Sequence, residues 1–439
     1  MKKHLSVRYG TIQGCYWMGY AALMGYASVY LLEKGFTNTQ IGLLTAVGCI
    51  VSAVLQPALA SYADRPESPS VRTMLLGANL IQLVLVISLA ATAESSSMVV
   101  RTLLYGASIT MLMLMIPFVN SLGMETIRQG EELDYGIGRG MGSVAYAIAS
   151  WLLGRLTASF GADMIPIWAY RAEHSFPHSV YFTFRLKRTR KKAEAEKEET
   201  GAAGPVDFLK RYPSFVVVLL GCILIFMSHS LINSFNYQIA MAKGGGSGEM
   251  GNAMTISAVS ELPTMFLFGY LLKKKSSVSG SASPPVFVLK SIRTFLAFNI
   301  PTYYAVQPFQ MFGWALINVA CVYYVDGIME PQDSIKGQAY MAMTITAGNV
   351  MSSLFGGWLI DAAGVGAMLI CASLAAFIGW LIVCLGSKEA KLHRKDKESA
   401  RNRTWFRALC RTALIYFCFL YTSHHSICNG KPLFPGQPG

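Results

Sequence analysis

Long apolar runs separated by short polar segments make up most of this 439-residue chain. A helix needs about 20 apolar residues to cross the hydrocarbon core of a bilayer, which is about 30 Å thick. Twelve runs reach or approach this length, and each predicts a membrane-spanning helix. They cover residues 9–32, 39–63, 73–93, 98–120, 140–160, 164–184, 213–240, 251–272, 286–307, 309–328, 335–360 and 364–386.

The sixth of these runs is degenerate, because charged and histidine residues interrupt it at Arg171, Glu173, His174 and His178. Basic residues gather in the cytoplasmic loops of membrane proteins. If residues 164–184 cross the bilayer, nearly all basic clusters of the chain lie on one side. We therefore expect this run to cross, with both termini in the cytoplasm.

A segment rich in both signs of charge, residues 185–212, separates six runs from six. Segments with so few apolar residues cannot bury a core and act as linkers. The sequence thus predicts an all-α integral membrane protein of twelve transmembrane helices in two six-helix bundles. Residues 1–184 and 213–387 would form the bundles, 185–212 a charged cytoplasmic linker, and 388–439 a basic, disordered cytoplasmic tail. A 6+6 repeat is typical of transporters with a central site between two bundles.

Composition agrees with a membrane protein. Hydrophobic residues make up 53% of the chain and charged residues only 14%, against roughly a quarter in soluble proteins. The net charge of +13 would suggest nucleic acid as a partner of a soluble protein. Here the basic residues lie between apolar runs and at the ends, so the expected partner is the lipid bilayer, with no nucleic acid. The nine cysteines are scattered without CxxC pairs, and neither a metal site nor a cofactor is expected.

Glu261 lies within the apolar run 251–272. Ionised in a lipid-facing helix it would cost about 2.5 kcal/mol or more, so we expect it to face the protein interior. Two interpretations stay open: a proton-coupling group, or a protonated or paired glutamate that locks two helices together. Arg293 in the ninth run matches its depth when the rise per residue is counted along both helices.

Polar residues recur at helical spacing on two runs. His229, Asn233 and Asn236 share one face of the seventh run, and Gln13, Trp17 and Tyr20 share one face of the first. These faces are typical of a pathway between bundles, which makes Gln13, Trp17, Asn233 and Asn236 candidate substrate-binding residues. The alternative is interhelical hydrogen bonding in a closed core.

The segment Asp134-Tyr-Gly-Ile-Gly-Arg139-Gly-Met-Gly-Ser143 resembles one found in the lactose permease branch of the major facilitator superfamily. This branch includes nucleoside and phenylpropionate permeases. The resemblance implies that Arg139 contacts substrate. A juxtamembrane topology charge is the other interpretation of this arginine.

Asp64-Arg65 stands where the same superfamily carries a loop signature, which implies a cytoplasmic gating motif. Ala60 and Pro66-Glu67 depart from the signature, so the match is partial.

Ser260-Glu-Leu-Pro is similar to the eighth helix of the phenylpropionate permease family. This resemblance aligns Glu261 with a buried glutamate of that helix, and the family register places Lys290 opposite it. Gln310-Met-Phe-Gly313 stands where the lactose permease has its histidine and its proton-carrying glutamate, and this chain has neither. Proton coupling would therefore depend on Glu261.

The expected function is secondary active transport in the cell inner membrane. It is proton-coupled uptake, or symport, of a small organic solute such as the aromatic acid phenylpropionate, by alternating access in a monomer. A facilitator or exporter of sugars or nucleosides on the same fold is the alternative. A membrane sensor or enzyme is disfavoured, because the loops hold no catalytic constellation of residues. No catalytic residue is therefore assigned.

Overall fold

A computed structural model describes the protein. It covers residues 2–63, 65, 67–92, 97–183, 205–274, 283–311, 313–314, 317, 321, 324–325 and 328–393. Asp64, most of the expected linker and residues 394–439 of the expected tail lie outside this part of the chain.

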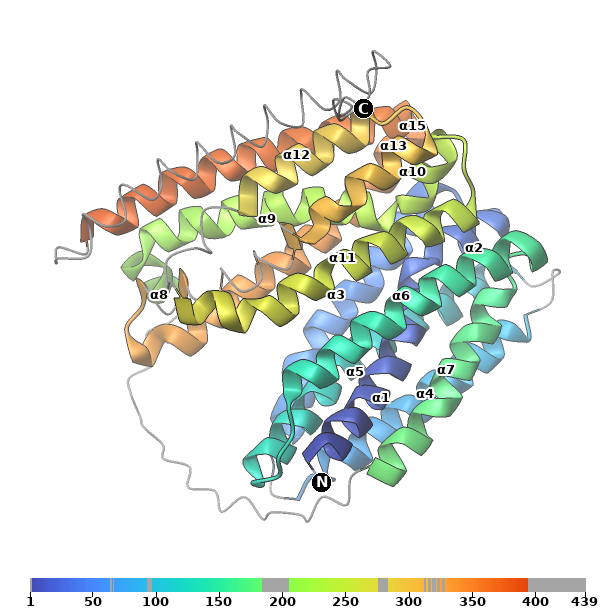
Figure 1. Ribbon diagram of the computed structural model, residues 1–439, viewed down its shortest axis with the longest axis horizontal. Coiled ribbons are helices and arrows are strands. Elements are labelled where there is room, and N and C mark those ends of the chain that lie inside the picture. Colours follow the sequence, from blue (N-terminus) through green and yellow to red (C-terminus); the bar gives the residue numbers. More distant parts are fainter. Residues whose placement is uncertain are drawn as a thin grey trace, which may run out of the picture.

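The N-terminal half forms a bundle of helices that pack side by side (Figure 1). We call the helices α1 to α7 the N-terminal bundle. A short π-helical turn, η1, interrupts its first span. Its elements are α1 (Lys2–Tyr20), η1 (Ala21–Gly25), α2 (Ala27–Glu33), α3 (Asn38–Ala63), α4 (Val71–Ala90), α5 (Met98–Arg128), α6 (Tyr135–Phe160) and α7 (Met164–Thr183).

The C-terminal half forms a second group, which we call the C-terminal bundle (Figure 1). Its longest helix, α15, contains a break at Gly364, where the positive φ of 82° favours a residue without a side chain. The elements are α8 (Pro205–Arg211), α9 (Pro213–Ser234), α10 (Asn236–Ala242), α11 (Ser247–Lys274), α12 (Ser283–Leu296), α13 (Ile300–Val306), the 3-10 turn η2 (Gln307–Phe309) and α15 (Pro331–His393).

The all-α class predicted from the sequence is confirmed in the described residues. By length and composition, five described helices could cross a membrane. They are Asn38–Ala63, Val71–Ala90, Met98–Ile127, Pro213–Ser234 and Lys336–Gly386. The expected boundary between the ninth and tenth runs, near 308, is wrong. The chain leaves the helix after Leu296 and starts again at Ile300, because Asn299 and Thr302 form a reciprocal capping box there.

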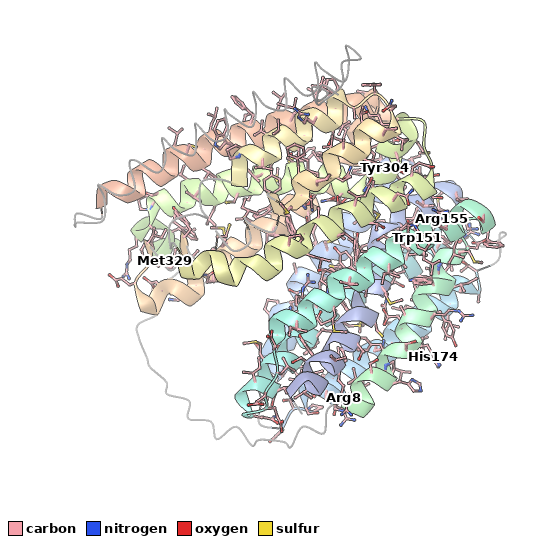
Figure 2. The ribbon with its side chains drawn as sticks, viewed as in Figure 1. Arg8, Trp151, Arg155, His174, Tyr304 and Met329 are labelled. Atoms are coloured by element: carbon pink, nitrogen blue, oxygen red, sulfur yellow. The ribbon has the colours of Figure 1, made fainter. Side chains whose placement is uncertain are left out.

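The degenerate sixth run forms the helix α7, and three of its four interrupting residues, Arg171, His174 and His178, are exposed. Ala169, Ala172, Phe176 and Val180 recur at three- and four-residue spacing and are all buried. His174 lies on the opposite, exposed face, and Figure 2 shows it at the outer edge of the bundle. The buried stripe explains how this run keeps its place in the bundle despite its polarity.

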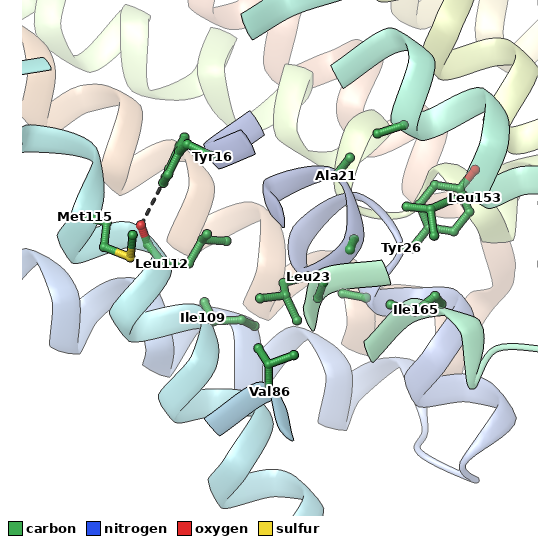
Figure 3. Close-up of a cluster of buried hydrophobic side chains, with 14 of the residues drawn as sticks. Tyr16, Ala21, Leu23, Tyr26, Val86, Ile109, Leu112, Met115, Leu153 and Ile165 are labelled. Atoms are coloured by element: carbon green, nitrogen blue, oxygen red, sulfur yellow. Dashed lines mark hydrogen bonds between the residues drawn. The ribbon is translucent and has the colours of Figure 1, made fainter. Parts of the chain in front are cut away.

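Buried tyrosines form hydrogen bonds between helices of the N-terminal bundle. The hydroxyl of Tyr16 donates to the carbonyl of Leu112 at 3.0 Å, a bond that Figure 3 shows within the apolar cluster between helices. Tyr26 in the same way donates to the carbonyl of Ser150 at 2.6 Å. A buried hydroxyl needs such a partner, and each bond therefore fixes the relative position of two helices while the ring fills the core.

In the C-terminal bundle, α8 occupies the last residues of the expected linker and packs on the helices. Its Phe208 is buried and stacks on Tyr340 of α15, with ring centroids 5.2 Å apart. Arg211 donates to the Asp333 carboxylate at 3.1 Å. Figure 2 places Met329 of this region and Tyr304 of α13 at opposite ends of the bundle.

Glycines let the two bundles approach closely. A methyl group on Gly42 of α3 would lie 2.0 Å from the carbonyl oxygen of Ser353 on α15, and one on Gly357 would lie 2.1 Å from the carbonyl oxygen of Asn38. Those two contacts join α3 to α15. The bundles also meet where α11 packs on α6, and there a methyl on Gly251 would lie 2.6 Å from the carbonyl oxygen of Ser150. Small residues at such crossings permit backbone contact between membrane helices.

A carboxylate of one bundle caps a helix of the other. Asp361 of α15 accepts four hydrogen bonds from the start of α3: the amide and side chain of Asn38 at 3.2 and 2.7 Å, and the amide and hydroxyl of Thr39 at 2.7 and 2.6 Å. Partial burial by itself would raise the pKa of Asp361, but these bonds outweigh it and hold the pKa below its ordinary value. The bundles converge at this end, near α2 and α10, and diverge toward the N-terminus and α8 (Figure 1).

We predict that Gly42→Ala opens this end of the molecule. The added methyl must move about 1.5 Å from the Ser353 carbonyl to reach an ordinary contact distance of about 3.5 Å. Spin labels at Gln40 and Ala362, both exposed, would report a longer interbundle distance. The control is Gly77→Ala, since nothing lies within 4 Å of a methyl there. Equal distances in the two variants would contradict the close contact.

Candidate functional site

An aromatic wall lines the side of the N-terminal bundle that faces α11. Trp17 and Tyr20 of α1 lie with ring centroids 4.9 Å apart, and each ring lies 6.4 Å from that of Tyr146 on α6. The side-chain amide oxygen of Gln13 accepts from the Trp17 indole at 3.0 Å, while its nitrogen donates to the Tyr9 hydroxyl at 2.7 Å. Gln13 therefore holds the edge of Trp17 in place.

Arg139 of α6 lies over the Trp17 ring of this wall. Its guanidinium carbon is 4.2 Å from the Trp17 ring centre, within the range of a cation–π interaction. One guanidinium nitrogen donates to the Ser143 hydroxyl at 3.2 Å, one turn further along α6. The side chain stays partly exposed. A planar cation is thus held on an aromatic surface with hydrogen-bond donors still available.

Glu261 of α11 faces the wall from the C-terminal bundle. Its carboxylate acts electrostatically on Arg139 and on Tyr146, both in the opposite bundle. On its own side it interacts with Lys290 of α12 and hydrogen-bonds the Gln310 side chain. The residue is partly exposed, so the carboxylate lies at the boundary between the bundles.

Gln310 connects the two ionisable groups of the C-terminal bundle. Its amide oxygen accepts a hydrogen bond from the Lys290 ammonium, which leaves the amide nitrogen as the donor for Glu261. Lys290 is only 2% exposed. A buried cation requires a partner, and Lys290 has both the amide and the nearby carboxylate.

The structure brings Lys290 to Glu261 and places Arg293 elsewhere. The Arg293 guanidinium carbon lies 5.9 Å from the Phe309 ring centre, and the side chain is partly exposed. The expected pairing of Arg293 with Glu261 rested only on the rise along each helix. Three residues also rotate a side chain most of the way around a helix of 3.6 residues per turn, so two residues of suitable depth can have very different neighbours.

The polar face predicted on the seventh run, which the structure divides into α9 and α10, is partly packed and partly exposed. His229 is buried and stacks on Trp314 at 4.5 Å, while Asn236 is buried and accepts from the Tyr303 hydroxyl. These contacts match the closed-core alternative. Asn233 is exposed and hydrogen-bonds the His229 ring at 2.8 Å, so it is the member of the three that is open to a ligand.

The expected gating motif is described only in part. Arg65 is exposed, and its guanidinium carbon lies 6.0 Å from the Tyr62 ring centre. Asp64 lies outside the described residues. In the same described part, no group of three or more His, Cys, Asp or Glu side chains is arranged to hold a metal ion.

Two residues of the site escaped the sequence analysis. Tyr146 lies seven residues after Arg139, a spacing that returns to the same helix face, so that pattern could have identified it. Gln310 was noted as a replacement for an ionisable residue. Its role as a bridge depends on how α12 packs against the following helix, and no spacing in the sequence carries that information.

Two helical bundles with charged and aromatic groups between them define a secondary transporter. The model of the MFS_1 like family matches residues 9–392, and the chain belongs to this family. It is accordingly a multi-pass membrane protein. A search of curated proteins gives no match.

Solved transporter structures share the fold. A mutant of the nucleoside transporter NupG is 14% identical with a TM-score of 0.71, the alignment covering 88% of this chain and 99% of NupG. A POT family transporter in complex with a thioalcohol-conjugated peptide is 11% identical with a TM-score of 0.67, covering 88% and 96%. An inward-facing, occupied bacterial homologue of the human lysosomal transporter Spinster is 13% identical with a TM-score of 0.62, covering 91% and 97%.

We predict that Gln310→Leu destabilises the protein by about 3 kcal/mol, because it leaves the buried Lys290 without its hydrogen-bond acceptor. Lys290→Met in the same chain should recover part of this loss, giving a coupling energy of about 0.5–3 kcal/mol in the double-mutant cycle. Thermal unfolding of the purified protein in detergent measures each variant. Strictly additive effects would contradict the proposed bridge.

Proposed function

We propose that the protein couples proton entry to the uptake of a small organic anion, with an aromatic acid such as phenylpropionate as the favoured class. One observation carries the proposal: Arg139, lying on an aromatic wall, faces Glu261 across the boundary between the bundles. The two groups belong to different bundles, so their interaction changes when the bundles move.

The charges of the site favour an anion. Arg139 and Lys290 together outnumber the single carboxylate of Glu261 among the groups that interact there. A guanidinium binds a carboxylate through two parallel hydrogen bonds. The rings of Trp17, Tyr20 and Tyr146 offer flat surfaces against which an aromatic substrate ring packs in stacked or edge-on contacts. A substrate with both an aromatic ring and a carboxylate uses both features.

Competition for Arg139 provides the coupling. When Glu261 is ionised, its carboxylate attracts Arg139 and opposes substrate binding. When Glu261 holds a proton, this attraction disappears, and Arg139 pairs with the substrate carboxylate instead. Proton and anion therefore bind together, and the loaded site carries the same net charge as the empty one. The bundles then rock about the site to expose it on the other side.

The same proposal includes the organisation of the chain. The bundles would comprise residues 1–184 and 213–387, with the linker 185–212, the tail 388–439 and both termini on the cytoplasmic side of the inner membrane. Asp64 and Arg65 would form a cytoplasmic gating motif, and the transporter would work as a monomer. Likeness to the phenylpropionate permease family supports this arrangement through the Glu261-Leu-Pro segment.

We predict that Glu261→Gln abolishes accumulation driven by a pH gradient while substrate exchange continues. Glutamine keeps the size and hydrogen bonding of the side chain but never titrates, so the carrier resembles the protonated form. Proteoliposomes would be tested with labelled aromatic acids, sugars and nucleosides, with and without a gradient. Glu131→Gln is the control, since Glu131 is exposed in a loop. Accumulation equal to wild type in Glu261→Gln would exclude coupling through this residue.

We predict that Arg139→Lys weakens apparent substrate affinity about tenfold, the loss of one charged hydrogen bond of about 1.4 kcal/mol. Lysine keeps the charge but loses the planar fork. Arg155→Lys provides a matched control, because Arg155 lies on the same helix with its guanidinium carbon 5.1 Å from the Trp151 ring centre. Figure 2 shows Arg155 and Trp151 on α6, near the end where the bundles converge. Equal affinities in the two variants would argue that Arg139 is only a topology charge.

A further inference from the structure

A second carboxylate lies buried inside the N-terminal bundle, apart from the site between the bundles. Glu173 of α7 is 1% exposed. One of its oxygens accepts a hydrogen bond from the Asn79 side chain of α4 at 2.6 Å. Its other oxygen, Oε1, has no hydrogen-bond partner in the described part of the chain.

The surroundings of Glu173 contain further unsatisfied polar atoms. Gln82 is fully buried, and neither its amide oxygen nor its amide nitrogen has a partner among the described residues. It lies three residues after Asn79 on α4, so both side chains share one face of this helix. That face packs against α7, where Asn79 already contacts Glu173.

The charge state of Glu173 follows from this environment. Within the described residues it has a single hydrogen bond and no ion pair. An ionised carboxylate buried in this way loses its hydration and costs several kcal/mol. The amide nitrogen of Gln82 could donate to an ionised Glu173, but that bond would leave the charge buried without a cation. A proton on Glu173 Oε1 removes the charge, and it gives the unpartnered amide oxygen of Gln82 a donor.

The titratable and charged groups on the elements packed against Glu173 do not neutralise it. On α7 itself, Arg171 and His174 lie on the exposed face. The η1 turn carries no titratable residue. On α1, Glu173 influences Cys15 and Tyr16 electrostatically. Arg72 lies in the first turn of α4, and the arginines of α6, Arg139 and Arg155, lie over tryptophan rings. The other titratable residues of α1 and α6 include Arg8, Tyr9, Tyr20, Tyr135 and Tyr146.

Glu173 also lies against the helix that carries the aromatic wall. A methyl group on Gly19 of α1 would lie 2.8 Å from Glu173 Oε1, so the carboxyl group packs directly on the α1 backbone. Trp17 and Tyr20 lie on either side of Gly19 in the sequence. The π-helical turn η1 begins two residues after Gly19, and such turns often mark functional positions in helices.

We propose that Glu173 is a second proton-binding site, which holds its proton in a hydrogen bond to the Gln82 amide oxygen and controls the position of α1. Loss of the proton to water leaves a charge packed on the Gly19 backbone. Because the carboxyl group packs directly on α1, a movement of α1 together with Trp17 lets water reach the charge. This inference goes beyond the proposed function, because it concerns a different carboxyl group and does not require Glu261 to titrate.

Infrared spectroscopy of the full-length protein in liposomes tests the first part of the proposal. The wild type at neutral pH should show the carbonyl band of a protonated carboxylic acid, and Glu173→Gln should lack it. Glu261→Gln should keep the Glu173 band, which separates this test from that of the proposed function. A spectrum unchanged in Glu173→Gln would overturn the proposal.

The Gln82→Leu variant tests the hydrogen bond without altering the acid. The Glu173 band should shift to higher frequency, as the hydrogen bond from the acid is lost. An unshifted band would overturn the pairing with Gln82. This measurement remains decisive if Glu173→Gln fails to fold.

Fluorine NMR of protein labelled with fluorotryptophan tests the link to α1. The Trp17 resonance, identified by its loss in Trp17→Phe, should move with pH in the wild type over the range in which the infrared band disappears. In Glu173→Gln this movement should be absent. The same pH-dependent movement in the variant would overturn the control of α1 by Glu173.

Discussion

The bilayer offers no hydrogen-bond partners, so the buried polar groups of this protein depend on partners inside the chain. Helices satisfy the backbone. The buried tyrosine hydroxyls donate to carbonyl oxygens of neighbouring helices, as Tyr16 and Tyr26 do. The charged groups between the bundles obey the same constraint, since Lys290 reaches Glu261 through the amide of Gln310. The positions of the helices and the composition of the site thus have a common cause.

Hydropathy alone predicted most of the helices, because the requirement for apolar residues extends along an entire span. It failed at residues 297–299, where a local capping box decides the boundary although the neighbouring residues are apolar. The same limit applies to the site. Sequence patterns indicated Glu261, Arg139 and Trp17 as individual residues. The bridge through Gln310 and the burial of His229 against Trp314 depend on contacts between helices, which the patterns do not contain.

Two positive groups and one carboxylate make the site asymmetric between the bundles. Arg139 belongs to the N-terminal bundle, whereas Glu261 and Lys290 belong to the C-terminal one. Lys290 is fixed within its own bundle by the Gln310 bridge. The interaction of Arg139 with Glu261 is therefore the one that changes as the bundles separate. In the proposed function, a substrate anion bound to Arg139 would alter the free energy of that movement.

The cap that Asp361 provides for α3 bears on how easily the molecule changes shape. The Thr37 hydroxyl and the Gln40 side chain already cap α3 from within its own bundle, and the Asp361 carboxylate adds hydrogen bonds from the opposite bundle. Separation of the bundles removes the bonds to Asp361, and water takes the place of the carboxylate. An N-terminal cap contributes only about 1 kcal/mol, a small multiple of thermal energy. A contribution of this size stabilises the conformation with the bundles in contact by only a small amount. The two end states of a transport cycle can therefore stay close in free energy.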